Sequence, residues 1–309
     1  MAINKVMKKV LKAFSFNKVE VESFRNVAKL KAIDPMKSFY RTIEYPVLND
    51  AYEIPLRIFL PHEEALEDGN EAPVMFFIHG GGWATGTLDS YERICARLAI
   101  ATEHLVVAIE YRLAPEFKFP IGLEDCYCAA KDLFEGKIIP WANEDNITLI
   151  GDSAGGNLCA SLSLLARDRG EFLPRRQILL YPAVNNDYSE KSLFPSVREN
   201  GSDYVLTSGK MRDYVNLYLK DENDRKSQYF APILEKDLSN QPDTLVITAE
   251  FDPLRDEGKA YGHRLEKAGS RVEVHMIENA IHGFFELGIK HYHVEESFEL
   301  INQFLEGAY

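Results

Sequence analysis

The chain has 309 residues, of which 46% are apolar and 27% are charged. This composition is typical of a globular protein with a substantial core, and it excludes the fibrous and intrinsically disordered classes. The formal net charge is −13, from 35 lysines and arginines against 48 aspartates and glutamates. Nucleic acid is therefore a poor partner.

Residues 1–42 form a basic leader that differs from the rest of the chain. They hold ten basic and three acidic residues, so their net charge is +7 and the remainder carries −20. Apolar residues from Ile3 to Phe14 recur every three or four positions, which predicts a helix with one apolar face. A second helix is predicted over 24–30. Lysines interrupt every apolar stretch, so the leader lacks the pattern of a signal peptide, and no segment has the length of an apolar transmembrane helix.

After the leader, the pattern changes to short β-rich runs at 43–47 and 56–60, separated by an Asn-Asp turn, which predict a hairpin. Strands and helices then alternate. The predicted strands lie at 74–78, 105–110, 147–150, 178–181, 245–248 and 272–277, and the predicted helices at 90–101, 122–134, 154–169, 256–268 and 294–305. Because this alternation requires crossover connections, we expect an α/β fold with a mostly parallel sheet of about eight strands flanked by helices.

The interval from Pro182 to Asp243 interrupts the alternation and is too long for a plain loop. A helix is predicted within it over 210–219. We expect this insertion and the N-terminal helices to cover the functional site together. The predicted organisation is N-terminal cap helices at 1–42, a first core segment at 43–185, a cap insertion at 186–240 and a second core segment at 241–309.

Four cysteines, at positions 95, 126, 128 and 159, lack the paired spacing of a zinc site and of a secreted disulfide framework. We expect them to be reduced thiols in the core. Such thiols are typical of a cytoplasmic protein.

Residues 151–155 have the sequence Gly-Asp-Ser-Ala-Gly, a G-x-S-x-G element between a predicted strand and a predicted helix. In that context the element predicts a nucleophile elbow, a tight turn that exposes Ser153 above the sheet. The N-terminus of the following helix favours negative charge that develops beside the serine. Ser153 is therefore the candidate nucleophile.

A nucleophilic serine needs a base and an orienting acid, which follow it in this architecture in the order Asp or Glu, then His. Five histidines come after Ser153. His282 follows the strand at 272–277, where the ends of parallel strands place catalytic groups. His263 and His275 fall inside a predicted helix and a predicted strand. His282 is therefore the candidate base.

The acid is expected after the strand at 245–248. Asp252 has this position, from which a carboxylate can fix the imidazole tautomer. Asp256 and Glu257 are typical of the first turn of a helix. Spacing alone leaves Glu250 open as a rival.

Three successive glycines in the run from His79 to Trp83 follow the apolar strand at 74–78. Without Cβ atoms, their backbone N–H groups can approach a reacting group closely. We assign the N–H groups of Gly81, Gly82 and Ala154 to an oxyanion hole. A phosphate-binding loop is the rival interpretation, but the run has neither a Gly-Lys-Ser/Thr ending nor the pattern G-x-G-x-x-G.

Together, these motifs resemble the hormone-sensitive lipase family of α/β-hydrolases, which includes bacterial acetyl esterases and carboxylesterases. The blocks that carry the resemblance are HGGGW at 79–83, YRLAPE at 111–116, GDSAGGNL at 151–158, DPLRDEG at 252–258 and HGF at 282–284. The matching segment spans residues 74–285. The resemblance implies an α/β-hydrolase fold with a helical cap. It also implies Ser153, Asp252 and His282 as the triad, which favours Asp252 over Glu250.

In this family, Tyr111, Arg112 and Glu116 are implied to brace the site without reacting. The implied function is hydrolysis of short-chain carboxylic esters through an acyl-enzyme, with a small-molecule ester as partner and no metal or organic cofactor. The same machinery serves amide or formamide hydrolases and deacetylases. A non-catalytic ligand-binding role is disfavoured because every catalytic part is present.

The basic leader adds the alternative of an interfacial lipase, held on an anionic membrane by its lysines at 5, 8, 9 and 12. We favour a cap helix with solvated lysines, because the acidic remainder of the chain would be repelled by the same membrane. The sequence is compatible with a homo-oligomer. The candidates for pocket-lining aromatic residues are Trp83, Phe14, Phe24, Tyr188, Phe194 and Tyr214.

Overall fold

The computed structural model describes residues 11–12, 15, 19–31, 40–67, 71–286 and 291–307. The leader helix predicted from Ile3 to Phe14 lies outside the described residues, apart from Leu11 and Lys12, which are helical. The next helix, α2 (Val21–Lys31), confirms the helix predicted at 24–30.

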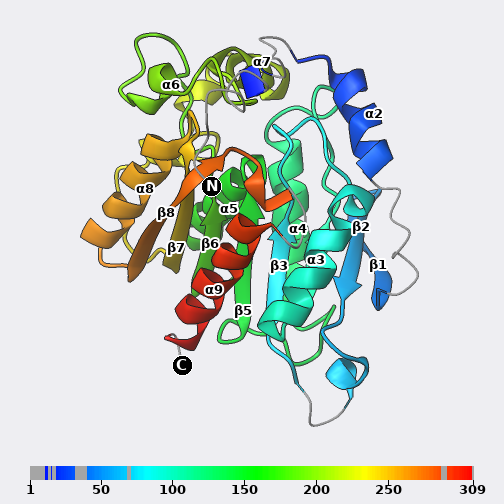
Figure 1. The fold of residues 1–309 in the computed structure, drawn as a ribbon. Helices are drawn as coiled ribbons and strands as arrows, with labels where there is room; N and C mark the ends of the chain where they lie inside the picture. Colours follow the sequence, from blue (N-terminus) through cyan, green and yellow to red (C-terminus); the bar gives the residue numbers. More distant parts are fainter. Residues whose placement is uncertain are drawn as a thin grey trace.

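The strands of the described chain form one sheet in the order β1-β2-β4-β3-β5-β6-β7-β8 (Figure 1). Their bounds are β1 (Thr42–Asn49), β2 (Tyr52–Phe59), β3 (Val74–Ile78), β4 (Leu105–Ile109), β5 (Ile147–Asp152), β6 (Arg176–Leu180), β7 (Asp243–Phe251) and β8 (Val272–Ile281). β1 and β2 form an antiparallel hairpin, and β2 pairs antiparallel with β4. All other neighbours are parallel. The predicted hairpin and the mostly parallel sheet are confirmed.

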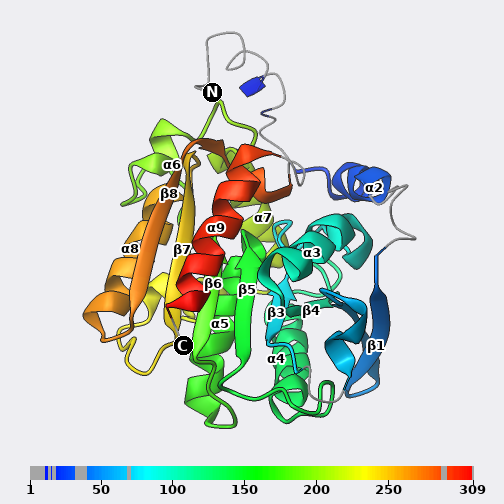
Figure 2. The same cartoon turned by 60° about the horizontal axis from the view of Figure 1, so that its bottom comes forward.

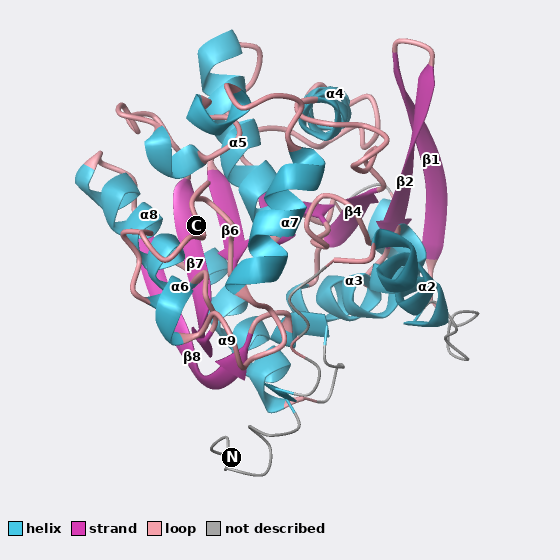
Figure 3. Cartoon of the chain, turned by 90° about the horizontal axis from the view of Figure 1, so that it is seen from above, coloured by secondary structure: helices cyan, strands magenta, loops and turns pink. Residues whose placement is uncertain are grey.

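Helices cover both faces of the sheet, and each face has its own core. The flanking helices are α3 (Leu88–Thr102), α4 (Ile121–Phe134), α5 (Ala154–Arg169), α8 (Arg255–Lys267) and α9 (Tyr292–Glu306). Seen from above, α3 and α9 lie on one side of the sheet, and α4 and α5 on the other (Figure 3).

β3 lies inside the sheet, and its residues explain why its sequence does not alternate between polar and apolar. Its residues are all buried. Val74, Phe76 and Ile78 join the core under α4, α5 and α8, whereas Met75 and Phe77 join the core under α3 and α9. Because successive side chains of a strand point to opposite faces, both sets must be apolar.

The insertion and α2 lie at one end of the sheet. The insertion holds α6 (Ser196–Glu199) and α7 (Ser208–Tyr218), and α7 confirms the helix predicted at 210–219. Figures 1 and 2 show α6, α7 and α2 at the same end of the molecule. No helix within the described ranges is long and apolar enough to cross a membrane.

The end of β8 differs from the prediction. The strand does not end at residue 277 but continues to Ile281, one residue before His282. Its pairing register with β7 shifts near this end. Asn279 has φ of 60°, and its N–H donates to Glu250 Oε2 at 2.7 Å. The residues after the predicted strand end therefore extend β8 through an irregularity in its pairing, where asparagine tolerates the positive φ well.

Three of the four cysteines, Cys95, Cys126 and Cys159, are buried free thiols, as predicted. The prediction is wrong for Cys128, which is a free thiol but only partly buried. It lies on α4, packs against the core, and its Sγ is 3.3 Å from the carbonyl oxygen of Leu48 on β1.

Candidate active site

Ser153 lies at a sharp turn between β5 and α5. Its φ of 53° and ψ of −116° are outside the regions that side-chain-bearing residues normally adopt. The Ser153 N–H donates to the carbonyl oxygen of Leu180 at 2.8 Å, which ties the strained residue to β6. A Cβ on Gly155 would clash with the carbonyl oxygen of Ile78, so this position requires glycine. The G-x-S-x-G sequence thus forms a strand-turn-helix elbow.

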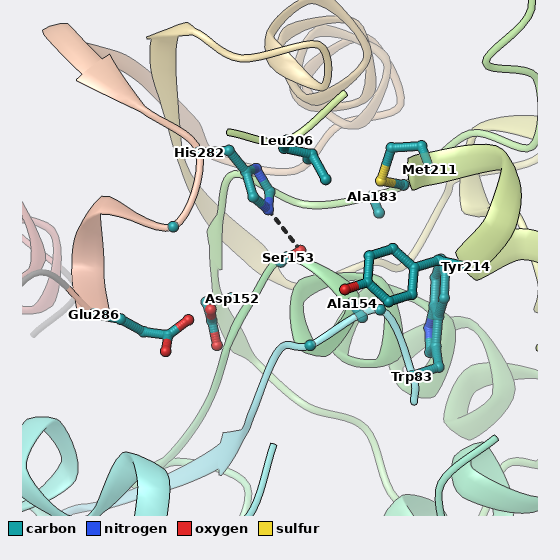
Figure 4. A pocket seen from close by; sticks show the side chains of 13 residues that line it. Trp83, Asp152, Ser153, Ala154, Ala183, Leu206, Met211, Tyr214, His282 and Glu286 are labelled. Carbon is teal, nitrogen blue, oxygen red and sulfur yellow. Dashed lines mark hydrogen bonds between the residues drawn. The ribbon is translucent and has the colours of Figure 1, made fainter. Parts of the chain in front are cut away.

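Asp252, His282 and Ser153 form a continuous chain of hydrogen bonds. His282 Nε2 lies 2.8 Å from Ser153 Oγ (Figure 4), and His282 Nδ1 lies 2.7 Å from Asp252 Oδ2. The Asp252 side chain is fully buried, whereas 11% of the His282 side chain is exposed. With Nδ1–H donating to the carboxylate, Nε2 is free to accept the serine proton. The structure therefore brings together all three residues that the sequence singled out.

Two backbone contacts hold Asp252 in place beneath the histidine. The N–H of Leu254 donates to Asp252 Oδ1 at 2.8 Å, and the side-chain amide of Asn200 donates to the Asp252 carbonyl oxygen at 3.1 Å. Asn200 follows α6 in the insertion, and the sequence analysis did not identify it. A buried asparagine far away in sequence gives no local signal of this role.

The rival acids have other partners. Glu250 accepts the N–H of Asn279 in β8, and Asp256 pairs with Arg255 and accepts the N–H of Ser196. Within the described hydrogen bonds, neither carboxylate contacts His282. The geometry therefore agrees with the family resemblance in favouring Asp252.

Glu257 lies in the first turn of α8, as predicted, but it is not a solvated carboxylate. It is fully buried, and its Oε1 accepts the N–H groups of Val184 and Asn185 and the hydroxyl of Tyr188 at 2.9, 3.2 and 2.9 Å. Burial raises the pKa of Glu257 well above its ordinary value. This carboxyl anchors the start of the insertion to α8.

The glycine run lies beside the serine in a conformation that demands glycine. Gly81 and Gly82 have φ of 111° and 60°. A Cβ on Gly81 would clash with the carbonyl oxygen of Thr85, and one on Gly82 with the ring of Tyr214. Gly81, Gly82 and Ala154 line the same cavity as Ser153 and His282. The residues predicted to form the oxyanion hole therefore meet next to Ser153.

Comparison with known proteins agrees with this geometry. A family model described as alpha/beta hydrolase fold matches residues 75–286. An arylesterase of Saccharolobus solfataricus is 34% identical over 281 residues, which cover 88% of this chain and 85% of that protein. A solved structure of a Pyrobaculum calidifontis esterase superposes with a TM-score of 0.85 at 34% identity and covers 97% of each chain.

The chain belongs to the hormone-sensitive lipase family of α/β-hydrolases. A further relative, an ethyl acetate hydrolase of Pseudomonas putida, is 32% identical over 240 residues, which are 77% of this chain and 74% of that protein. By class, the hydrolase is a carboxylic ester hydrolase. The α/β-hydrolase fold expected from the motifs is confirmed.

Asp152 supports the glycine loop of the hydrolase, a role that the sequence analysis missed. It is buried, and its Oδ1 accepts the N–H of Gly80 at 2.8 Å. Its Oδ2 lies 3.1 Å from the hydroxyl of Tyr91, which is also 3.2 Å from Glu286 Oε1. Burial, together with the charge of Glu286, raises the pKa of Asp152 to about 7. In the sequence, this role was indicated by an acidic residue at the end of an apolar strand.

The residues implied to brace the site have structural contacts. The hydroxyl of Tyr111 donates to the carbonyl oxygen of His79 at 3.0 Å, at the start of the glycine run. The Arg112 guanidinium donates two hydrogen bonds to the buried carboxylate of Asp125, at 2.6 and 2.8 Å, and the Arg112 N–H donates a third at 3.0 Å. These contacts connect the YRLAPE segment to the glycine loop on one side and to α4 on the other.

Glu116 connects the same segment to the N-terminal helix. Its carboxylate accepts two hydrogen bonds from Arg25 of α2, both at 2.8 Å. Arg25 also donates to the carbonyl oxygens of Ala84 and Ala114, both at 3.0 Å. The Arg25 guanidinium lowers the pKa of Glu116 to about 2. Arg25 therefore fastens α2 to the segment that follows the glycine run.

Two cavities meet at His282. The smaller one, of about 110 Å³, contains Ser153, and its walls include Trp83, Ala183 and Met211. The larger one has a volume of about 570 Å³ and extends to Phe24 on α2. The sequence did not predict that Met211 lines the smaller cavity, because it does not show how the insertion lies over the sheet.

The candidate aromatic residues have different outcomes. Trp83 lines the smaller cavity, Phe24 the larger one and Tyr214 both. Tyr188 and Phe194 line neither cavity: Tyr188 is buried against Glu257, and Phe194 packs on the hydrophobic core. Phe14 lies outside the described residues.

Proposed function

We propose that this hydrolase is a serine carboxylesterase that cleaves esters of short acyl groups through an acyl-enzyme on Ser153. The observation that carries the proposal is the hydrogen-bond chain from Asp252 through His282 to Ser153 Oγ, at the wall of a cavity. The substrate is a small-molecule ester.

In the first half of the reaction, Ser153 Oγ attacks the ester carbonyl carbon while its proton passes to His282 Nε2. The carbonyl oxygen becomes an oxyanion, which the N–H groups of Gly81, Gly82 and Ala154 stabilise. The imidazolium is stabilised by Asp252, and it gives the proton to the departing alcohol oxygen. An acyl ester on Ser153 remains.

In the second half, a water molecule takes the place of the alcohol. His282 removes a proton from the water, and the hydroxyl attacks the acyl carbon through the same oxyanion site. The bond to Ser153 Oγ breaks, the serine regains its proton from His282, and the acid leaves. Each catalytic group thus returns to its starting state.

The cavity that contains Ser153 supports the proposed preference for short acyl groups. Its volume is about 110 Å³, and its wall residues Trp83, Ala183 and Met211 are each at most 2% exposed. A closely packed wall of this kind resists expansion. The Pseudomonas putida relative is named for ethyl acetate, the ester of a short acid.

The cap belongs to the same proposal. Residues 1–42 and 186–240 form it, and residues 43–185 and 241–309 form the catalytic core. The described contacts support this division. Lys12 pairs with Asp203 at 3.1 Å, and the N–H of Val19 donates to Asp213 at 3.0 Å. The leader and the insertion therefore contact each other above the core.

The experiment is hydrolysis of p-nitrophenyl esters from acetate to palmitate by the wild type and by Ser153→Ala. We expect turnover of acetate to hexanoate, a steep fall for longer acids, and a loss of about 10⁵-fold or more in kcat in the variant. Undiminished hydrolysis by Ser153→Ala would refute the nucleophile. Turnover of matched amides without esters would instead indicate an amide hydrolase.

A further inference from the structure

The two cavities that meet at His282 share one wall. Leu206 and Tyr214 line both of them, together with Gly81, His282, Gly283 and Glu286. Ser153 and Ala154 line the smaller cavity, whereas the lining of the larger one includes His282 but neither of these residues. The serine therefore faces one cavity, and the histidine faces both.

The chemistry fixes which part of an ester enters which cavity. The leaving oxygen must lie beside His282 Nε2 to receive its proton, so the alcohol extends on the histidine side. The acyl chain extends from the carbonyl carbon toward the opposite wall. Figure 4 shows Trp83, Ala183 and Met211 on the other side of Ser153 from Glu286. The smaller cavity thus takes the acyl group, and the larger one takes the alcohol.

The acyl side is closed by interlocking aromatic rings. Trp83 is 1% exposed and stacks on Tyr218 with ring centroids 4.8 Å apart. Its Nε1–H donates to Asn157 at 3.3 Å. The ring of Tyr214 packs against Gly82, where there is no space for a Cβ. Because these rings are held on several sides, a longer acyl chain cannot move them aside.

The alcohol side is wide and mainly apolar. Its volume is about 570 Å³, and its lining includes the apolar residues Leu11, Phe24 and Val205. Its charged members already have protein partners. Lys210 Nζ donates to the carbonyl oxygen of Val205 at 2.7 Å, and Glu286 Oε1 lies 3.2 Å from the Tyr91 hydroxyl. An alcohol that fits this space therefore needs bulk and apolar surface and does not need charge.

We infer that the substrates are esters in which a short acid is joined to a large apolar alcohol, with Met211 limiting the acid and Val205 facing the alcohol. This inference rests on the proposed function, since it assigns the two sides of the ester that Ser153 cleaves. It adds the alcohol class and the residues that select it.

A pair of isomeric esters tests the inference on the wild type. Octyl acetate and ethyl octanoate have the same atoms and similar leaving groups, but they place the long chain on opposite sides of the ester bond. We expect kcat/KM for octyl acetate to exceed that for ethyl octanoate by about tenfold or more. Equal values or the reverse order would overturn the inference, as would failure to cleave either isomer by enzyme that hydrolyses p-nitrophenyl acetate.

Two variants test which residues select the acid and which select the alcohol of the substrate. Met211→Ala removes part of the acyl wall, so the ratio of ethyl octanoate to ethyl acetate should rise about tenfold. Val205→Phe fills the alcohol cavity, so the ratio of octyl acetate to ethyl acetate should fall by a similar factor. If each variant moves both ratios alike, the assignment of the cavities is wrong. Failure of the proposed function has a different signature, because Ser153→Ala would then still cleave both esters.

Discussion

Ser153 and Asp152 are adjacent in the chain but have different hydrogen-bond partners. Both residues line the smaller cavity, but Ser153 Oγ lies beside His282 Nε2, whereas the buried carboxylate of Asp152 accepts the N–H of Gly80. β5 ends at Asp152 and Ser153 lies on the sharp turn that follows, so the two side chains reach different partners. The strained backbone of Ser153 is possible because this surrounding structure fixes it on both sides.

The choice of Asp252 over Glu250 predicts a difference between two conservative variants. Asp252→Asn should lower kcat by about 10⁴-fold, because an amide no longer fixes the productive tautomer of His282. Glu250→Gln should stay within about threefold of the wild type, since its amide oxygen can still accept the N–H of Asn279. Steady-state kinetics on p-nitrophenyl acetate measures both. Equal losses would contradict the assignment of the acid.

Asp152 predicts a pH dependence of stability. Its pKa is raised from 3.8 to about 7 by burial, so the folded protein binds its proton more tightly than the unfolded chain. The associated stability is fully present below about pH 4 and is lost as the pH rises to about 7, at about 1 kcal/mol per pH unit.

Asp152→Asn removes this titration and can still accept the N–H of Gly80. Its unfolding free energy should therefore fall less between pH 5 and pH 7 than that of the wild type. Urea unfolding of both proteins at the two pH values provides the comparison. Parallel changes in the two proteins would show that Asp152 does not titrate as described.

At the scale of helices and strands, the sequence predicts those features that a local pattern of residues determines. The strand at 74–78 was predicted at its observed bounds, because an uninterrupted apolar run of five residues suits a position between two layers of helices. The irregularity in β8 was missed, because Asn279 gives the same local signal in a turn as in an irregular strand. Ser153, Asp252, His282 and the glycine loop lie together as predicted, because their motifs constrain backbone geometry.

The cavity walls could not be predicted in the same way. Leu206 and Met211 are apolar residues of the insertion, and the sequence alone does not distinguish them from ordinary core residues. Their role depends on how the insertion packs across the sheet. That packing is determined by distant contacts, such as those of Asn200 and Glu257, which carry no periodic signal.

The clamp made by Arg25 predicts a link between α2 and the alcohol cavity, because Phe24 of the same helix lines that cavity. Arg25→Ala removes the contacts to Ala84, Ala114 and Glu116 and should loosen α2. We expect a severalfold rise in KM for octyl acetate and faster proteolysis within 19–31. Lys29→Ala, on an exposed position of α2, is the matched control. Equal effects of the two variants would exclude a specific clamp.

At the scale of the whole molecule, the sheet separates two cores and presents the site at the end covered by the insertion and α2 (Figure 1). The charge is divided as well, with +7 on residues 1–42 and −20 on the remainder. Because the acidic body is repelled by anionic lipid, we expect no co-sedimentation with phosphatidylglycerol vesicles in about 0.15 M salt. Binding that persists in this salt would favour an interfacial lipase instead.

The central claim is that Ser153 is the nucleophile activated by His282, and covalent labelling tests it most directly. Diethyl p-nitrophenyl phosphate reacts with an activated serine and leaves a stable phosphoester that cannot be hydrolysed quickly. Intact-mass and peptide analysis should show one adduct on Ser153, formed in step with the loss of ester hydrolysis, and none at this position in Ser153→Ala or His282→Ala. Full labelling at another residue, or activity that survives complete labelling of Ser153, would contradict the account.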